Sequence, residues 1–121
     1  MHSAAQAYGQ VAKKTASPRE LEADLLLKAA RQLLSIQENW DAKQNELEAA
    51  LLYNRKLWTV FLTSVTGENN PLPPEIRQNV ANLGVFVMNR TLTMMSAPKP
   101  EQLSALIKIN CDIAAGLRGA A

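Results

Sequence analysis

Apolar residues recur along this chain at alternating intervals of three and four positions, the spacing of helices that pack lengthwise against one another. We call such a row a seam. The seam in the middle of the chain consists of Leu47, Leu51, Asn54, Trp58, Phe61 and Val65. A second seam near the end consists of Leu103, Leu106, Asn110, Ile113 and Leu117. The pattern predicts an all-α protein, a small bundle of four main helices.

Capping and turn residues divide the chain into those helices. Ser17-Pro18-Arg19-Glu20 is typical of a helix start. Ser17 can cap the helix N-terminus, Pro18 suits the first helical position, and Glu20 completes a capping box with Ser17. Asp41 and Gln44 form a second capping-box pattern, which predicts a very short connection between antiparallel helices. The predicted helices cover 17–39, 42–66, 74–95 and 100–117.

The first 16 residues differ from the rest because they are rich in alanine and glutamine, with Tyr8 as the only large side chain. They are expected to form either an N-terminal arm or a short helix that Tyr8 holds against the body. Residues 17–121 are predicted to form a single helical domain, since 121 residues are enough for one domain with a real core.

The charge balance narrows the classes of partner. The formal net charge is +2, and acidic and basic residues are interleaved, so neither nucleic acid nor an anionic membrane is expected to bind directly. No stretch approaches the roughly 20 apolar residues that cross a bilayer. The start of the chain has no apolar signal-peptide core, and the lone Cys111 fits a reducing compartment, so we expect a cytoplasmic protein.

Catalytic and metal-binding residues are scarce. His2 is the only histidine and Cys111 the only cysteine, so we expect no metal site, no cofactor and no enzymatic activity. The glycines are scattered singly and form no phosphate-binding loop. Cys111 lies near the last seam and is expected to be a buried structural thiol.

The run from Val85 to Met88 is the strongest candidate for a binding surface. Consecutive helical residues point about 100° apart, so this run is apolar all round. Such a helix is either central to the bundle or exposes Val85, Phe86 and Met88 to a partner.

The middle seam offers further candidates. Trp58 and Phe61 are either core residues or the lining of a partner groove. Aromatic residues at helical spacing usually belong to the core. Arg55 either contacts an acidic partner or belongs to a solvated surface pair with Lys56. Asn54 and Asn110 interrupt their seams, and they can pair if the seams face one another, which would leave no buried group unsatisfied.

Taken together, several segments resemble the FlaF family of flagellar biosynthesis proteins from alphaproteobacteria. The segments occur in order over nearly the whole chain: Ala7-Tyr8, Ser17 to Glu22, Asn54 to Phe61, Asn70 to Pro73, Leu83 to Val87, Leu106 to Asn110 and Gly116-Leu117. The chain departs from the family where Thr63-Ser64 replace a usual acidic residue and where Phe86 replaces a common tryptophan.

The resemblance implies a regulator that acts as a chaperone-like factor for flagellin. It would bind the amphipathic helices at the two ends of the flagellin chain. Such a factor supports flagellin synthesis and its secretion through the flagellar export system. An alternative is a non-enzymatic adaptor that acts mainly through an FlbT-type regulator of flagellin messenger RNA. Neither the chaperone-like factor nor the adaptor is expected to have catalytic residues.

Overall fold

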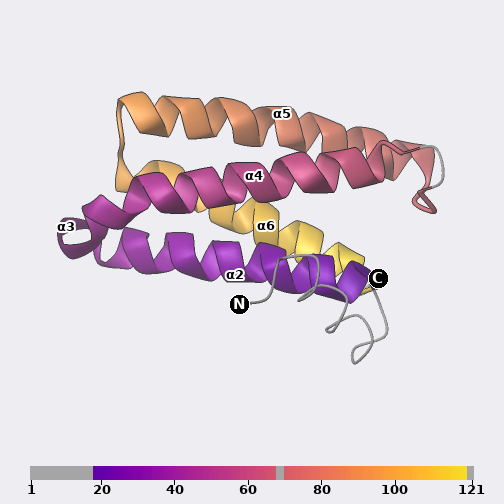
Figure 1. Ribbon diagram of the computed structural model, residues 1–121, viewed down its shortest axis with the longest axis horizontal. Helices are drawn as coiled ribbons and strands as arrows, with labels where there is room; N and C mark the ends of the chain where they lie inside the picture. Colours follow the sequence, from indigo (N-terminus) through magenta and orange to yellow (C-terminus); the bar gives the residue numbers. More distant parts are fainter. Residues whose placement is uncertain (1–17, 68–69, 120–121) are drawn as a thin grey trace, which may run out of the picture.

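The computed structural model describes residues 18–67 and 70–119, and all regular structure in these ranges is helical (Figure 1). The elements are α2 (Pro18–Glu38), α3 (Trp40–Lys43), the 3-10 helix η1 (Gln44–Glu46), α4 (Leu47–Val65), α5 (Pro74–Ser96), the 3-10 helix η2 (Pro100–Gln102) and α6 (Leu103–Leu117). The prediction of an all-α bundle with four main helices is confirmed. The arm or short helix predicted for residues 1–16 lies outside the described residues.

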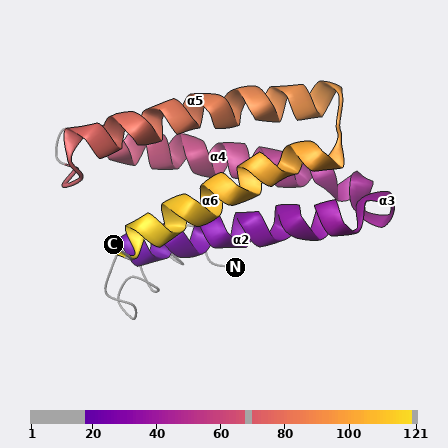
Figure 2. The same cartoon turned by 180° about the vertical axis from the view of Figure 1, so that it is seen from behind.

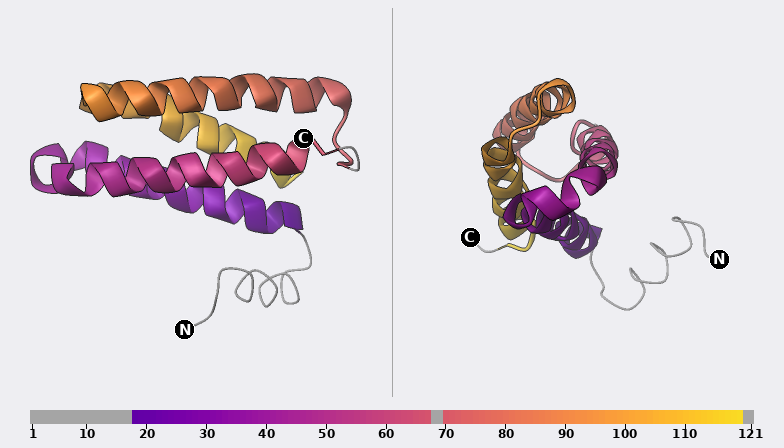
Figure 3. Two further views of the ribbon diagram at one scale, coloured as in Figure 1. Left: turned by 45° about the horizontal axis from the view of Figure 1, so that its top comes forward. Right: turned by 90° about the vertical axis from the view of Figure 1, so that its left-hand side faces the viewer.

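Seen end-on, the four long helices surround one core, with α4 and α6 facing each other across it (Figure 3). Helix α2 packs most extensively against α6 and also against α4, while α5 packs mainly against α4. Figure 2 shows the reason for the weak contact between α5 and α6: α6 begins beside the end of α5 and runs obliquely towards the start of α2. Helix α5 is therefore held mainly along one side.

The connection between α2 and α4 differs from the prediction. The second helix was expected to begin at about residue 42, but the chain passes through α3 and η1 before α4 begins at Leu47. The capping box of Asp41 and Gln44 does not form, because Asp41 lies inside α3, whose N-cap is Asn39, and Gln44 begins η1. Asn39 instead donates from Nδ2 to the carbonyl of Ser35, and its own carbonyl accepts from the amides of Ala42 and Lys43. The short connection is thus a compact helical reversal held by backbone hydrogen bonds.

The two predicted seams meet in the core. Trp58 Nε1 donates to Asn110 Oδ1 over 2.8 Å, and Asn110 Nδ2 donates to Asn54 Oδ1 over 2.8 Å and to the carbonyl of Leu26 over 3.2 Å. Trp58, Asn54 and Asn110 are all fully buried. The predicted pairing of the two amides is confirmed. The expectation that no buried group would lack a partner is wrong, because Asn54 Nδ2 has none among the described residues.

Helix α5 buries a row shifted from the expected one. Ile76, Val80, Leu83 and Val87 follow one another at intervals of four, three and four, which predicts that they form the buried row of this helix. In the structure, Ile76 is exposed and Leu83 is only half-buried. The buried residues are Val80, Gly84, Val87, Thr91 and Met94, which we call the inner seam. Gly84 belongs to it because Leu62 of α4 packs directly on its backbone: a Cβ at Gly84 would lie 2.6 Å from Leu62 Cδ1. A glycine here lets α4 and α5 approach closely.

The prediction for Cys111 was wrong, since its thiol is exposed rather than buried. The neighbouring Asn110 occupies the seam, and the next residue on a helix points about 100° away. A residue that follows a seam residue in the sequence is therefore not necessarily buried.

We predict that Trp58→Ala lowers the free energy of unfolding by about 3–5 kcal/mol, the usual effect of truncating a buried aromatic residue. Trp58→Phe should lower it by about 1–3 kcal/mol, because Asn110 Oδ1 then loses its donor. Urea unfolding followed by circular dichroism measures both, with Thr59→Ala on the exposed side of α4 as the control. An unchanged midpoint in Trp58→Ala would contradict the buried position.

Candidate functional site

Helix α5 carries a second apolar row beside its buried one. Ala81, Val85, Met88, Leu92 and Met95 follow one another at intervals of four and three, each one residue after a member of the inner seam. We call this row the outer seam. Val85 is 61% exposed and Leu92 is 59% exposed, while the other three members are half-buried. Because consecutive residues differ by about 100°, the outer seam runs next to the inner seam at the edge of the α4–α5 contact.

The exposed apolar side chains are concentrated on this helix. In the described ranges, the large apolar side chains that are exposed are Leu34, Leu52, Val60, Ile76, Val85, Phe86 and Leu92. Four of these seven belong to α5. Apolar residues exposed singly are normal, but a row at seam spacing on one helix is a feature of binding surfaces.

The structure separates the predicted set of Val85, Phe86 and Met88. Val85 and Met88 belong to the outer seam. Phe86 points to another side of α5, where the guanidinium of Arg90 lies over its ring at 5.0 Å from the centroid. Arg90 also donates to the carbonyl of Gln102, so the ring is covered from within the molecule. Phe86 thus contributes less free surface than Val85.

Trp58 and Phe61 are core residues. Their rings meet edge to face with centroids 5.4 Å apart, and neither is more than 3% exposed. Trp58 forms no part of an open surface. Phe61 contributes to the wall of a cavity at the far end of the bundle, described below.

A row on α4 borders the outer seam. Glu48 and Met95 line the same cavity, which places the start of this row beside the end of the outer seam. Leu52 and Arg55 follow Glu48 at intervals of four and three, so they lie on the same side of α4. Arg55 is half-buried, and its guanidinium makes no hydrogen bond or ion pair within the part of the chain that the structure describes.

We call the combined surface the α4–α5 face and define it by Glu48, Leu52, Arg55, Val85, Met88, Leu92 and Met95. Sequence reasoning identified Val85, Met88 and Arg55 but missed the other members. The signal for Leu92 and Met95 was present, since both continue the three-and-four spacing from Val85. No signal in the sequence indicated that Glu48 would lie beside Met95, because that proximity depends on how α4 and α5 pack.

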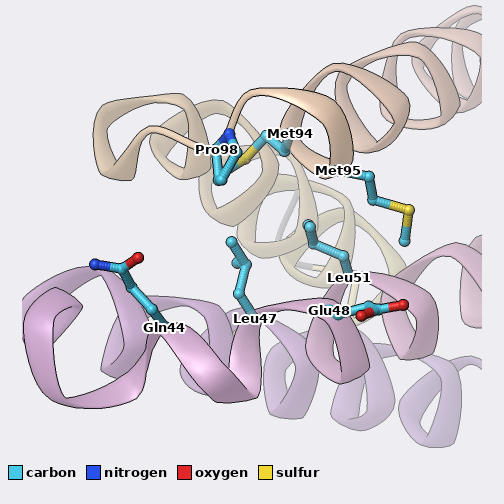
Figure 4. Close-up of a pocket in the computed structure, with 7 residues that line it drawn as sticks. All are labelled: Gln44, Leu47, Glu48, Leu51, Met94, Met95 and Pro98. Atoms are coloured by element: carbon cyan, nitrogen blue, oxygen red, sulfur yellow. The ribbon is translucent and has the colours of Figure 1, made fainter.

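The cavity at the end of this face has a volume of about 270 Å³ (Figure 4). Its lining residues are Gln44, Leu47, Glu48, Leu51, Met94, Met95 and Pro98. Leu47 and Leu51 project from α4 towards Met94 and Pro98, so apolar groups form its interior (Figure 4). Glu48 and Gln44 supply its polar groups.

A second cavity, of about 450 Å³, lies at the opposite end of the bundle. Its apolar wall comes from Phe61, Val65, Leu72 and Leu117, and Arg19 and Glu22 of α2 add charge. Burial raises the pKa of the Glu22 carboxyl above its ordinary value, and the positive charge of Arg19 opposes that shift. The lining also includes Pro18 and Asn70, which each follow a range that the structure does not describe.

Residues 18–67 and 70–119 were compared with the requirements of a metal site and of a membrane-spanning helix. In these ranges, no three His, Cys, Asp or Glu side chains gather closely enough to hold a metal ion. The described helices are all too short or too polar to cross a lipid bilayer.

Comparison with known proteins indicates a family. A family model described as flagellar protein FlaF matches residues 4–117. No curated protein and no solved structure matches the chain.

We predict that Glu22→Gln stabilises the protein at neutral pH. The folded state raises the pKa of Glu22, so it disfavours the charged carboxylate, and stability falls as the pH rises from the unfolded to the folded pKa. The neutral amide avoids that loss. Its melting temperature should exceed the wild-type value at pH 7, and the difference should shrink below the ordinary pKa of glutamate. Glu38→Gln, on an exposed position of the same helix, is the control. A difference that persists unchanged at low pH would contradict the assignment.

Proposed function

The chain belongs to the FlaF family of flagellar proteins, and on that premise we propose that it is a non-enzymatic, chaperone-like factor that binds flagellin in the cytoplasm. It holds newly made flagellin in an export-competent form. In this way it supports flagellin synthesis and secretion through the flagellar export system.

The outer seam of α5 is the observation that carries the proposal. A row of apolar side chains at three-and-four spacing is the natural complement of an amphipathic helix laid alongside it. From Ala81 to Met95 the row spans about 21 Å at 1.5 Å per residue, enough for four turns of a docked helix. The amphipathic terminal helices that the family resemblance assigns to flagellin have the matching chemistry.

Two features of the fold suit this surface to a helical partner. Helix α5 packs mainly on α4, so the outer seam lacks the neighbour that a central helix would have. Two of its five members, Met88 and Met95, are methionines, whose flexible side chains adapt to different apolar partners. A docked helix would complete the packing around α5.

We predict that Val85→Lys and Leu92→Lys each weaken flagellin binding about tenfold or more, because the new ammonium group must be buried without a partner. Both side chains are exposed, so the melting temperature should change little. The measurement is co-purification of flagellin with the tagged full-length protein, followed by titration of the purified components.

Val60→Lys is the matched control, because Val60 is 63% exposed but lies on a different side of α4. It should bind flagellin normally. Loss of binding in Val60→Lys, or normal binding in both α5 variants, would contradict the proposed site. Recovery of an FlbT-type regulator in place of flagellin would favour the adaptor function.

A further inference from the structure

We propose that α5 opens as a whole from the other three long helices, while α2, α4 and α6 keep their packing. Its hinges are the two connectors at its ends, residues 70–73 and 97–99. The opening exposes the inner seam to solvent. It is a property of this chain alone and does not depend on the proposed function.

The apolar packing that closes α5 is small for a helix of its length. Its buried apolar side chains are Val80, Val87 and Met94, because the other two members of the inner seam are Gly84 and Thr91. Helix α4 has 19 residues against 23 in α5, yet it buries six apolar side chains, a tryptophan and a phenylalanine among them. Since α5 also packs mainly against one neighbour, it is the long helix that costs least to detach.

Few polar bonds oppose the opening. In residues 18–67 and 70–119, two side-chain hydrogen bonds join α5 to other elements. Arg77 Nη1 donates to the carbonyl of Gly67 over 3.4 Å, and Arg90 Nη1 donates to the carbonyl of Gln102 over 3.1 Å. Both acceptors lie on the far side of a connector. The buried bonds of Asn110 join only α2, α4 and α6, so they remain intact when α5 opens.

The composition of α5 makes its helical structure dependent on packing. It contains three valines, two threonines, three asparagines and Gly84, all of which have low helix propensity. Helix α2, by contrast, contains none of these four residue types. Once α5 leaves α4, its backbone hydrogen bonds therefore break together, because a short helix without packing is unstable in water. The opening thus exposes the amides of the whole helix.

The two connectors allow α5 to move without disturbing its neighbours. Residues 70–73 and 97–99 form no helix, and Pro71, Pro73 and Pro98 lie within them. Figure 1 shows α5 running along the bundle between the two connectors. Because proline breaks the continuity of a helix, unfolding of α5 is not passed along the chain into α4 or α6.

Hydrogen exchange of the full-length protein, followed by mass spectrometry, tests the opening. After correction for intrinsic rates, the slowest amides of α5 should exchange about tenfold or more faster than the slowest amides of α4 and α6. Their exchange should also depend less on urea, since detaching one helix exposes less surface than global unfolding. Equal rates with equal urea dependence in all four helices would overturn the separate opening of α5.

A matched pair of variants shows which bonds survive in the open form. Gln37 of α2 donates to the carbonyl of Pro100 and to Ser104 Oγ, both over 2.8 Å, and these bonds do not involve α5. Gln37→Ala should therefore accelerate exchange in α6 about threefold and leave α5 unchanged, because the closed and open forms lose the same bonds. Arg90→Ala removes a bond that only the closed form has, so it should accelerate α5 and α6 alike. Equal acceleration of both helices by Gln37→Ala, or no effect of Arg90→Ala on α5, would overturn the proposal.

A disulfide that locks α5 to α4 gives an independent measurement. Leu62 Cγ lies 3.0 Å from the place of a Cβ at residue 84. In Leu62→Cys/Gly84→Cys, the two sulfur atoms are therefore within reach of a disulfide, and loss of the leucine removes the clash with the new Cβ. Cys111→Ser in the same chain prevents pairing with the exposed native thiol.

Oxidation of this variant should abolish the difference in exchange between α5 and α6, because only global unfolding then remains as a route. Its reduced form should keep that difference. A difference that survives oxidation would show local fraying of α5 instead of hinged opening, and would overturn the proposal.

Discussion

The side-chain amide of Asn110 is the interaction on which the rest of the structure depends. It accepts from Trp58, donates to Asn54 and donates to the backbone carbonyl of Leu26, and so joins α6 to both α4 and α2 at the centre of the core. Buried polar groups are costly unless they are paired, so any shift of one helix along another would break several of these bonds at once. The network therefore specifies the register of three helices, whereas apolar contacts alone tolerate sliding.

Helix α5 lies outside this network. It is held by its inner seam and by the close approach of Leu62 to Gly84, and the one polar side chain in that seam, Thr91, bonds within its own helix, to the carbonyl of Val87. No buried polar bond of the described core ties α5 to another helix. The protein thus combines a specified three-helix unit with a fourth helix attached mainly through apolar packing on α4.

This division explains where a binding surface can exist. A surface on α2, α4 or α6 that opened into the core would disturb the Asn110 network. The α4–α5 face leaves that network intact, because its members lie at the outer edge of one helix pair. Its exposed Val85 and Leu92 and its adaptable methionines all occur on α5, the long helix with the fewest neighbours in the described ranges. Recognition of a helix there requires no rearrangement of the core.

The sequence by itself determined the helical class, the positions of α2, α5 and α6 to within a few residues, and the burial of the seam that contains Trp58. These follow from periodicity and from proline and glycine punctuation, which are local properties. The pairing of Asn54 with Asn110 was also predictable, since a polar residue at a seam position needs a partner and each seam offered one.

Only the tertiary structure decided which side of α5 is free. A run that is apolar all round has no preferred face, so Val85, Phe86 and Met88 were equivalent in the sequence; packing against Leu62 turned Gly84 inward and left Val85 exposed. The cavity lined by both Glu48 and Met95 likewise depends on two helices that are distant in the chain. Periodicity is a property of one helix, whereas the exposure of a side chain depends on which other helices pack against that helix.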